Sequence, residues 1–161
     1  MSTSSLAFDP ETDLRLERVV PVAPRLVWRA WTEPALLERW FCPRPWRATD
    51  CAIDLRPGGG FRTTMRGPEG EQFENVGCYL EIVPERKLVF TDALRPDFRP
   101  SPEPFFTGVI LLAPEGTGTR YTAIAMHRDA EARQRHADMG FAEGWGKALD
   151  QLVEVAETLR N

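Results

Sequence analysis

The sequence predicts an α+β domain in which seven antiparallel strands are combined with two short helices after the first strand and one long C-terminal helix. Three observations predict this class. Apolar and polar residues alternate in seven short segments, apolar residues recur at helical spacing near the C-terminus, and almost every link between the strands is too short for a crossover helix. Links of that length join antiparallel neighbours, so we expect one antiparallel sheet.

Composition limits the class of protein. The chain has 161 residues, of which 42% are apolar and 27% charged, as expected for one folded domain. The formal net charge of −4 argues against a broad nucleic-acid-binding surface, and no apolar stretch reaches the roughly 18–20 residues of a membrane span. Three cysteines without CxxC spacing suit a reducing cytoplasm, and the N-terminus lacks the features of a signal peptide. We therefore expect a cytoplasmic protein with neither nucleic acid nor membrane as a partner.

The first third of the chain is divided by prolines. Residues 1–12 are polar and are expected to form a flexible N-terminal tail, so that a single domain occupies residues 13–161. Alternating residues predict a first strand over residues 14–20. Pro24 and Pro34 then begin two short helices, because proline is favoured in the first turn of a helix.

Strands and turns fill the middle of the chain. We expect the other six strands at residues 51–55, 61–66, 76–82, 88–90, 106–113 and 119–127. In the third of these six strands, one face is expected to carry Val76, Cys78, Leu80 and Ile82. Residues 93–104 contain four prolines and one aromatic residue and can be neither helix nor central strand. This segment is either a functional loop, such as a lid over a binding site, or a loop that caps an edge of the sheet.

Residues 129–159 predict one long amphipathic helix with Asp129 as its N-cap. Gly140, Gly144 and Gly146 lie within it, although glycine costs about 1 kcal/mol relative to alanine inside a helix. Three such residues suggest a need for space beside the helix. The chain also has five tryptophans, which are difficult to bury completely in a small domain.

These features favour a cavity between the sheet and the C-terminal helix, although the same aromatic residues can simply fill a core. The residues expected to line the cavity are Trp31, Trp40, Phe61, Met65, Phe90, Tyr121, His127, Phe141 and Trp145. Arg18 and Asp138 lie on the inward phases of their strand and helix, so either they meet as a pair or each reaches an exposed edge. His136 falls on the solvent face of a continuous helix.

No catalytic constellation stands out. The sequence has no nucleophile elbow, no HExxH motif and no Cys–His signature, and its glycine-rich turn precedes a strand rather than a helix. We therefore expect no catalytic residues, no metal and no cofactor.

Several segments resemble the homologues of the heat-shock-protein-ninety ATPase activator. The resemblance covers residues 13–159 and rests on Val27-Trp-Arg-Ala-Trp-Thr-Glu-Pro34, Leu37-Glu-Arg-Trp-Phe41, Gly58-Gly-Gly-Phe61, Gly77, Glu81-Ile-Val-Pro84, Leu88, Phe90-Thr91, and Gly144-Trp145 with Leu149 and Leu152. It implies the START-like helix-grip fold of the Bet-v-1-like superfamily, in which a curved sheet wraps around a long C-terminal helix and leaves a hydrophobic cavity. The eukaryotic activator also has a separate N-terminal chaperone-binding domain, which the 12 residues before the first strand do not provide.

Three functions remain open at this stage. The leading hypothesis is non-catalytic binding of a small hydrophobic or amphipathic molecule in the cavity. The alternatives are a chaperone-associated interaction protein and a cofactor-free enzyme of the cyclase or hydrolase kind. A homodimer is also left open.

Overall fold

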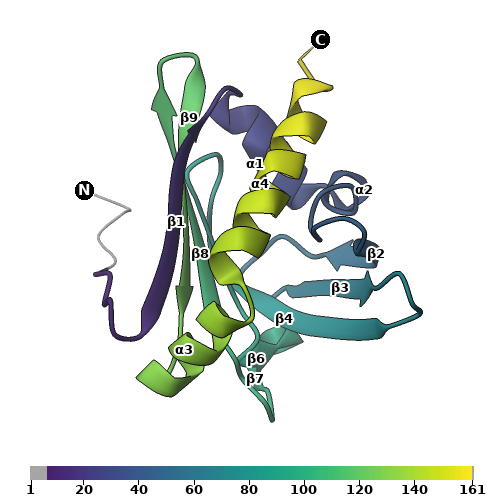
Figure 1. The fold of residues 1–161 in the computed structure, drawn as a ribbon, viewed down its shortest axis with the longest axis vertical. Coiled ribbons are helices and arrows are strands. Elements are labelled where there is room, and N and C mark those ends of the chain that lie inside the picture. Colours follow the sequence, from purple (N-terminus) through teal and green to yellow (C-terminus); the bar gives the residue numbers. More distant parts are fainter. Residues whose placement is uncertain (1–6, 161) are drawn as a thin grey trace.

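The structure, a computed structural model, describes residues 7–160. Within this range seven strands form one antiparallel sheet, which curves strongly from one edge to the other (Figure 1). In pairing order they are β1 (Asp13–Val20), β9 (Gly118–Met126), β8 (Thr107–Glu115), β5 (Lys87–Thr91), β4 (Gln72–Val83), β3 (Gly60–Arg66) and β2 (Arg47–Ile53). The predicted α+β helix-grip fold is confirmed.

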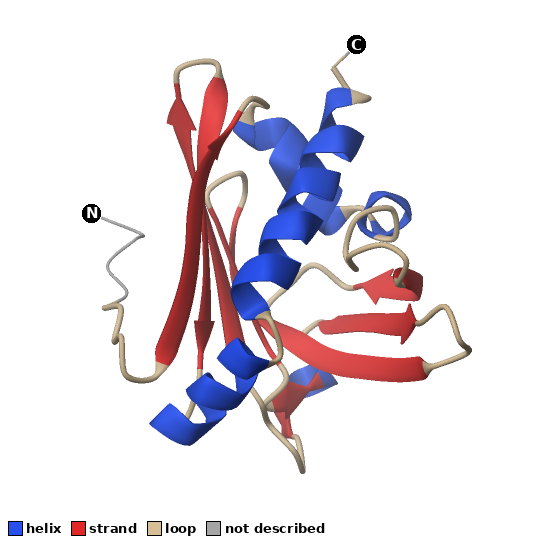
Figure 2. Cartoon of the chain, viewed as in Figure 1, coloured by secondary structure: helices blue, strands red, loops and turns tan. Residues whose placement is uncertain are grey.

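Helices cover the concave side of the sheet. α1 (Pro24–Thr32) and α2 (Pro34–Leu37) both begin at the predicted prolines. α4 (Phe141–Glu157) crosses the concave side of the sheet and packs against α1 (Figure 2). We call this concave side the inner face and the convex side the outer face. None of the helices in residues 7–160 combines the length and apolar character that a membrane-spanning helix requires.

The prediction of one continuous C-terminal helix is wrong. The segment forms α3 (Ala130–Asp138) and α4, separated at Met139 and Gly140. Gly140 adopts a φ of 92°, a left-handed conformation that glycine reaches without steric penalty. Asp129 does cap α3, since its carboxylate accepts a hydrogen bond from the Ala132 amide at 2.8 Å. The chain can therefore change direction between the two helices.

A bulge in β4 changes the predicted faces of that strand. The pairing of β4 with β5 shifts register between Tyr79 and Glu81. Tyr79 lies opposite Phe90 and Ile82 lies opposite Leu88, so both point to the inner face, whereas the buried Cys78 points to the outer face. The expectation that Cys78 and Ile82 share a face is wrong, because alternation predicts faces only for an unbroken ladder.

The proline-rich segment lies on the outer face. It forms a small hairpin of β6 (Leu94–Arg95) and β7 (Arg99–Pro100) around the 3-10 turn η1 (Pro96–Phe98). Its prolines and Phe98 pack over the glycines that begin β3: a Cβ added to Gly60 would lie 3.1 Å from Pro96. Gly60 points away from the inner face, on which its neighbour Phe61 lies. The suggestion that this segment is a lid over an inner cavity is therefore wrong.

A second apolar layer lies on the outer face of the strands β5, β8 and β9. Its buried members are Val89, Val109 and Ile124. Phe8, from the segment before β1, packs against this layer, and the Arg15 guanidinium lies 4.4 Å from the centre of its ring. Residues 1–6 of the predicted tail lie outside the described residues.

Candidate functional site

The inner face carries a continuous network of aromatic rings. The Trp31 ring lies 4.9 Å from that of Trp40 and 5.6 Å from that of Phe90, and Phe90 lies 5.2 Å from Phe61. Six of the nine predicted lining residues are buried with at most 7% of their surface exposed: Trp31, Trp40, Phe61, Phe90, Tyr121 and Phe141. The structure thus brings most of the predicted residues together, but it packs them against one another as a core.

The polar atoms of this core are paired internally. The indole N–H of Trp31 donates to the Tyr121 hydroxyl at 3.1 Å, and the indole N–H of Trp40 donates to the Ala30 carbonyl at 2.9 Å. Burial raises the pKa of Tyr121, so its hydroxyl stays protonated. Each of these polar side chains is therefore engaged in a hydrogen bond within the core.

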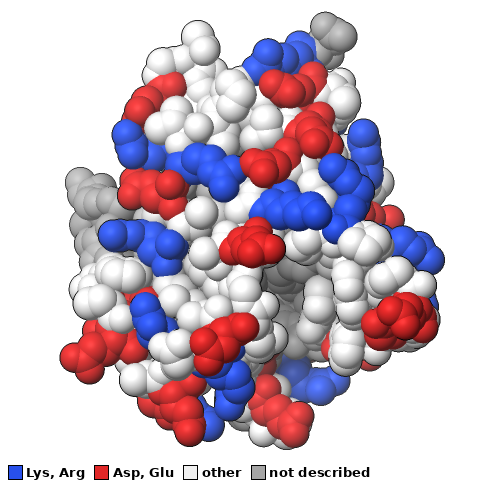
Figure 3. Space-filling view, viewed as in Figure 1, with Lys and Arg blue, Asp and Glu red and all other residues white. Residues whose placement is uncertain are grey.

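The inner face is open near the start of α4. Trp145 and Met65 are only half-buried, unlike the other apolar residues predicted to line the cavity. A Cβ added to Gly144 would find a single neighbouring atom within 4 Å, Cγ of Pro43 at 4.0 Å. Phe73, which pairs with Met65 across the sheet, is 55% exposed. Figure 3 shows a hollow on this side of the molecule, beside the first turns of α4 and above β3 and β4.

A single buried polar side-chain atom lacks a partner among residues 7–160. It is the hydroxyl of Tyr79, a residue with no exposed surface, whose ring stacks on Phe61 at 5.3 Å. Burial, together with the nearby Cys51 thiol, raises the pKa of Tyr79. An unpaired buried hydroxyl costs about 1–3 kcal/mol, so a hydrogen-bond acceptor placed beside it would stabilise the protein.

Two surface pockets are lined by other residues of the chain. One of about 640 Å³ is bounded by Glu38 and Arg39 and by the chain from Cys42 to Arg47. The other, of about 230 Å³, lies between the start of β3 and Pro96. Neither is lined by any of the nine residues predicted to line the cavity. In the described part of the chain, no three His, Cys, Asp or Glu side chains are grouped closely enough to hold a metal ion.

His127 and His136 form a buried pair at the lower end of the aromatic network. Nε2 of His127 lies 2.8 Å from Nδ1 of His136, and only 8% and 7% of the two residues are exposed. The expectation that His136 faces solvent is wrong, because the break before α4 changes the direction of α3 and turns His136 toward β9. Burial, with a smaller effect of His127, lowers the pKa of His136 to about 4.

Two phenylalanines that follow the proline-rich segment complete this end of the site. The Phe105 ring lies 4.9 Å from the His136 ring, and the Phe106 ring lies 5.8 Å from that of Trp145. The Asp92 carboxylate fixes both, since it accepts hydrogen bonds from their backbone amides at 2.7 and 3.1 Å. Burial raises the pKa of Asp92, although these two amides partly oppose the effect.

Arg18 and Asp138 do not meet. Arg18 forms an exposed ion pair with Asp150 of α4, in which the two charged atoms are 2.6 Å apart. Asp138 is exposed and accepts a hydrogen bond from the side chain of Gln134. The structure thus places the two residues apart, each with a different partner.

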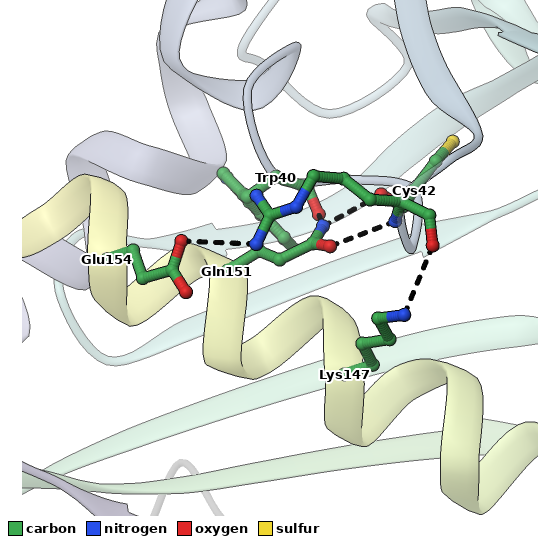
Figure 4. A network of polar contacts seen from close by, with 6 residues as sticks. Trp40, Cys42, Lys147, Gln151 and Glu154 are labelled. Atoms are coloured by element: carbon green, nitrogen blue, oxygen red, sulfur yellow. Dashed lines mark hydrogen bonds and ion pairs between the residues drawn. The ribbon is translucent and has the colours of Figure 1, made fainter.

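The wall opposite the sheet is held by Gln151, which is buried in the middle of α4 (Figure 4). Its side-chain N–H₂ donates to the carbonyls of Trp40 and Cys42, and its oxygen accepts from the backbone amide of Arg44. Lys147 donates to the Arg44 carbonyl at 3.1 Å. These bonds fix the chain between α2 and β2, including Pro43, over the open flank of α4.

This combination of sheet and helices recurs in known proteins. Residues 21–157 match the family model described as activator of Hsp90 ATPase homolog 1-like protein. The chain belongs to this family. The match includes α1, the whole inner aromatic network, the histidine pair and α4.

Solved structures of several other proteins have the same fold. A protein of Nitrosomonas europaea is 48% identical over 95% of this chain and 99% of its own, with a TM-score of 0.92. A protein of Mycobacterium smegmatis is 26% identical over 94% of each chain, with a TM-score of 0.79. An AHSA1-like protein of Aeromonas hydrophila, at 20% identity and a TM-score of 0.70 over 91% of this chain and 93% of its own, shows the fold alone. No curated protein matches the chain.

Sequence patterns did not predict that Tyr79, Phe105 and Phe106 belong to the site, or that His136 is buried. The two phenylalanines are adjacent and immediately precede an apolar strand, which is a detectable signal. Gln151 was also missed, although it lies between Ala148 and Val155 on the apolar side of the helix. Tyr79 had no comparable signal, because its inward position depends on the bulge in β4.

Proposed function

We propose that this protein binds a small hydrophobic or amphipathic molecule between the inner face of the sheet and α4, without catalysing a reaction. The observation that supports this most directly is the unfilled space beside Gly144. It adjoins Trp145, a half-buried residue of the inner aromatic network. A concave, mostly apolar site with few polar groups is typical of small-molecule binding.

The chemistry of the site favours an apolar body with few polar groups. The Trp145 ring and the Met65 side chain would contribute apolar contact area, at about 25 cal/mol per Å² removed from water. The Tyr79 hydroxyl lies deeper, against Phe61, and would donate one hydrogen bond to an acceptor that reaches it. A single such bond would orient the ligand and remove the cost of the unpaired hydroxyl. Burial of apolar surface would thus supply most of the binding free energy.

Binding of a neutral hydrophobic dye, Nile red, tests the proposal. Gly144→Leu places a side chain in the open space, and Ala142→Leu adds the same side chain two residues away at an exposed position of α4. We expect Gly144→Leu to weaken dye binding at least about tenfold and Ala142→Leu to leave it unchanged. Equal binding by the wild type and by a stably folded Gly144→Leu variant would overturn the proposal.

Native mass spectrometry of freshly purified protein gives a second, independent result. A co-purified apolar molecule that is absent from Gly144→Leu would support the proposal and identify the ligand class. We also infer a reducing, cytoplasmic setting, in line with free thiols at Cys42, Cys51 and Cys78.

A chaperone-associated role is the second candidate, because the matched family is described by its likeness to an activator of a chaperone ATPase. The measurement is the ATPase rate of the purified chaperone with and without this protein. Stimulation that survives Gly144→Leu would favour the chaperone role over ligand binding. Loss of stimulation in the Gly144→Leu variant would instead mean that the chaperone role depends on the ligand site.

A further inference from the structure

The hydrogen bonds around the two histidines determine where their protons lie. Nδ1 of His127 is 2.8 Å from the backbone carbonyl oxygen of Thr12. A carbonyl oxygen can only accept, so this nitrogen must carry a hydrogen and donate. The tautomer of a neutral His127 is thereby set, with its hydrogen on Nδ1 and a lone pair on Nε2.

The position of the hydrogen on the His136 ring follows from its bond to His127. In a neutral His127 the lone pair on Nε2 faces Nδ1 of His136 at 2.8 Å, so Nδ1 of a neutral His136 must donate to it. Its remaining nitrogen, Nε2, then has a lone pair and no hydrogen. Burial lowers the pKa of His136 to about 4, which keeps its ring neutral at pH 7. With both rings neutral, Nε2 of His136 is therefore an acceptor and cannot act as a donor.

No hydrogen bond joins this nitrogen to another group in residues 7–160, and since the Tyr79 hydroxyl is the one fully buried polar side-chain atom without a partner there, Nε2 lies at the exposed part of His136. Four aromatic rings, called the aromatic box below, surround the ring of His136. The ring centres around the His136 ring are those of Phe105 at 4.9 Å, Phe106 at 5.1 Å, Phe141 at 5.3 Å and Trp145 at 6.1 Å. With 7% of its surface exposed, His136 is more than nine-tenths buried and still reachable from outside. Phe106 and Trp145 connect this box to the open part of the inner face.

The charged groups nearby have other partners. The Asp92 carboxylate accepts from two backbone amides, and the Asp13 carboxylate accepts from the backbone amide of Asp9 and the hydroxyl of Thr12. Arg133 donates to the Asp13 carbonyl, and the Arg135 guanidinium lies 5.3 Å from the centre of the Phe105 ring. None of them donates to Nε2 of His136, so this acceptor remains available to a ligand.

We infer that His136 Nε2 is the polar anchor of the ligand site and selects molecules with a hydroxyl or N–H donor on a flat apolar body, such as a phenol. This inference rests on the proposed function and specifies its ligand class. The surrounding rings would hold the flat body by stacking and edge contacts. A carboxylate would bring only acceptors to a lone pair and would lose its hydration without a partner, so the site discriminates against it.

Three naphthalenes that differ in one substituent test the inference: 2-naphthol, 2-methoxynaphthalene and 2-naphthoate. Naphthol can donate a hydrogen bond, the methyl ether cannot, and the naphthoate is an anion at pH 7. For the wild type we expect naphthol to bind about tenfold more tightly than the methyl ether, and the naphthoate to bind most weakly. In His136→Phe, which keeps an aromatic ring at this position, the ratio of naphthol to methyl ether affinity should fall to about one.

The outcomes separate the inference from the proposed function. Equal binding of naphthol and the methyl ether by the wild type overturns the inference and leaves the proposed function standing. Absence of binding by both, together with absence of Nile red binding, overturns the proposed function. Preference for the naphthoate also overturns the inference, because an anion that carries only acceptors gains no hydrogen bond from the lone pair on His136.

Nitrogen NMR of the wild-type protein tests the proton positions directly and does not depend on a variant that folds. The chain contains only two histidines, so ¹⁵N-histidine labelling gives four ring-nitrogen signals. At pH 7 we expect Nδ1 of His136 to carry a hydrogen and Nε2 of His136 to be unprotonated. A hydrogen on Nε2 of His136 at neutral pH would overturn the inference.

Discussion

Gln151 donates a hydrogen bond to the carbonyl of Cys42 across 2.8 Å and so connects the middle of α4 to the chain between α2 and β2. The same amide group donates to the carbonyl of Trp40 and accepts from the amide of Arg44. One buried side chain therefore satisfies three backbone groups that belong to no helix or strand. The position of Pro43, and with it the width of the open space at Gly144, depends on this residue.

Replacement of Gln151 by leucine should destabilise the protein by about 2–4 kcal/mol. The variant keeps the side-chain volume but leaves the carbonyls of Trp40 and Cys42 without their donor, and each unsatisfied buried group costs about 1–3 kcal/mol. Chemical denaturation followed by tryptophan fluorescence gives the free energy of unfolding. Lys147→Ala is the matched control, because it removes an exposed bond to the same loop and should cost less than about 1 kcal/mol. Equal effects of the two changes would contradict this role of Gln151.

The two glycines at the start of α4 should respond to alanine in opposite directions. Gly140 has a φ of 92°, so Gly140→Ala should destabilise by about 1–2 kcal/mol although no atom lies within 4 Å of the added Cβ. Gly144 lies within the regular part of α4 beside open space, so Gly144→Ala should stabilise by about 0.5–1 kcal/mol. The melting temperatures of both variants, measured by thermal unfolding, test these two expectations. A rise in melting temperature for Gly140→Ala would show that the helix break does not need its left-handed conformation.

Acid should weaken the fold through His136. The unfolded chain binds a proton with the ordinary histidine pKa of 6.5, whereas in the folded protein the pKa of His136 is lowered to about 4. Between these values the unfolded state holds more protons, so stability is fully present above about pH 6.5 and falls as the pH drops toward 4. Allowing for partial solvent screening, the loss should be about 1–2 kcal/mol.

Urea unfolding of the wild type and of His136→Phe at several pH values isolates this contribution. The difference in unfolding free energy between the two proteins should shift in favour of the variant as the pH falls from 7 to about 4. A difference that stays constant over that range would mean that His136 titrates normally in the folded protein.

Alternation and helical spacing predicted the sheet, the two proline-started helices and the position of the C-terminal helix, because these patterns follow from burial of one face of each element. They failed where the ladder or the helix is interrupted. A glycine inside an apolar helical pattern is usually tolerated, so the break at Gly140 could not be distinguished from the helical Gly144 and Gly146. The phase computed for His136 was then carried through a helix that does not continue.

The candidate site was predictable to a similar extent. The apolar residues of the inner network were predicted from their phases, since each belongs to a regular segment. The polar groups of the site were not, because their roles depend on contacts between distant segments. Tyr79 points inward after a bulge, and His136 meets His127 only because α3 turns back toward the end of β9.

A double-mutant cycle on Trp31 and Tyr121 tests whether the inner network is a specific structure or only a collection of apolar residues. The two side chains share a buried hydrogen bond of 3.1 Å. Trp31→Phe leaves the Tyr121 hydroxyl without its donor, and Tyr121→Phe leaves the indole N–H without its acceptor, so each should cost about 1–3 kcal/mol for the unpaired group, with a further loss of packing for Trp31→Phe. The double variant removes both polar groups together. It should therefore be more stable than the sum of the single effects predicts, by about 1 kcal/mol. Strictly additive free energies of unfolding would mean that the hydrogen bond does not form, and that Trp31 is held by packing against Trp40 and Phe90 alone.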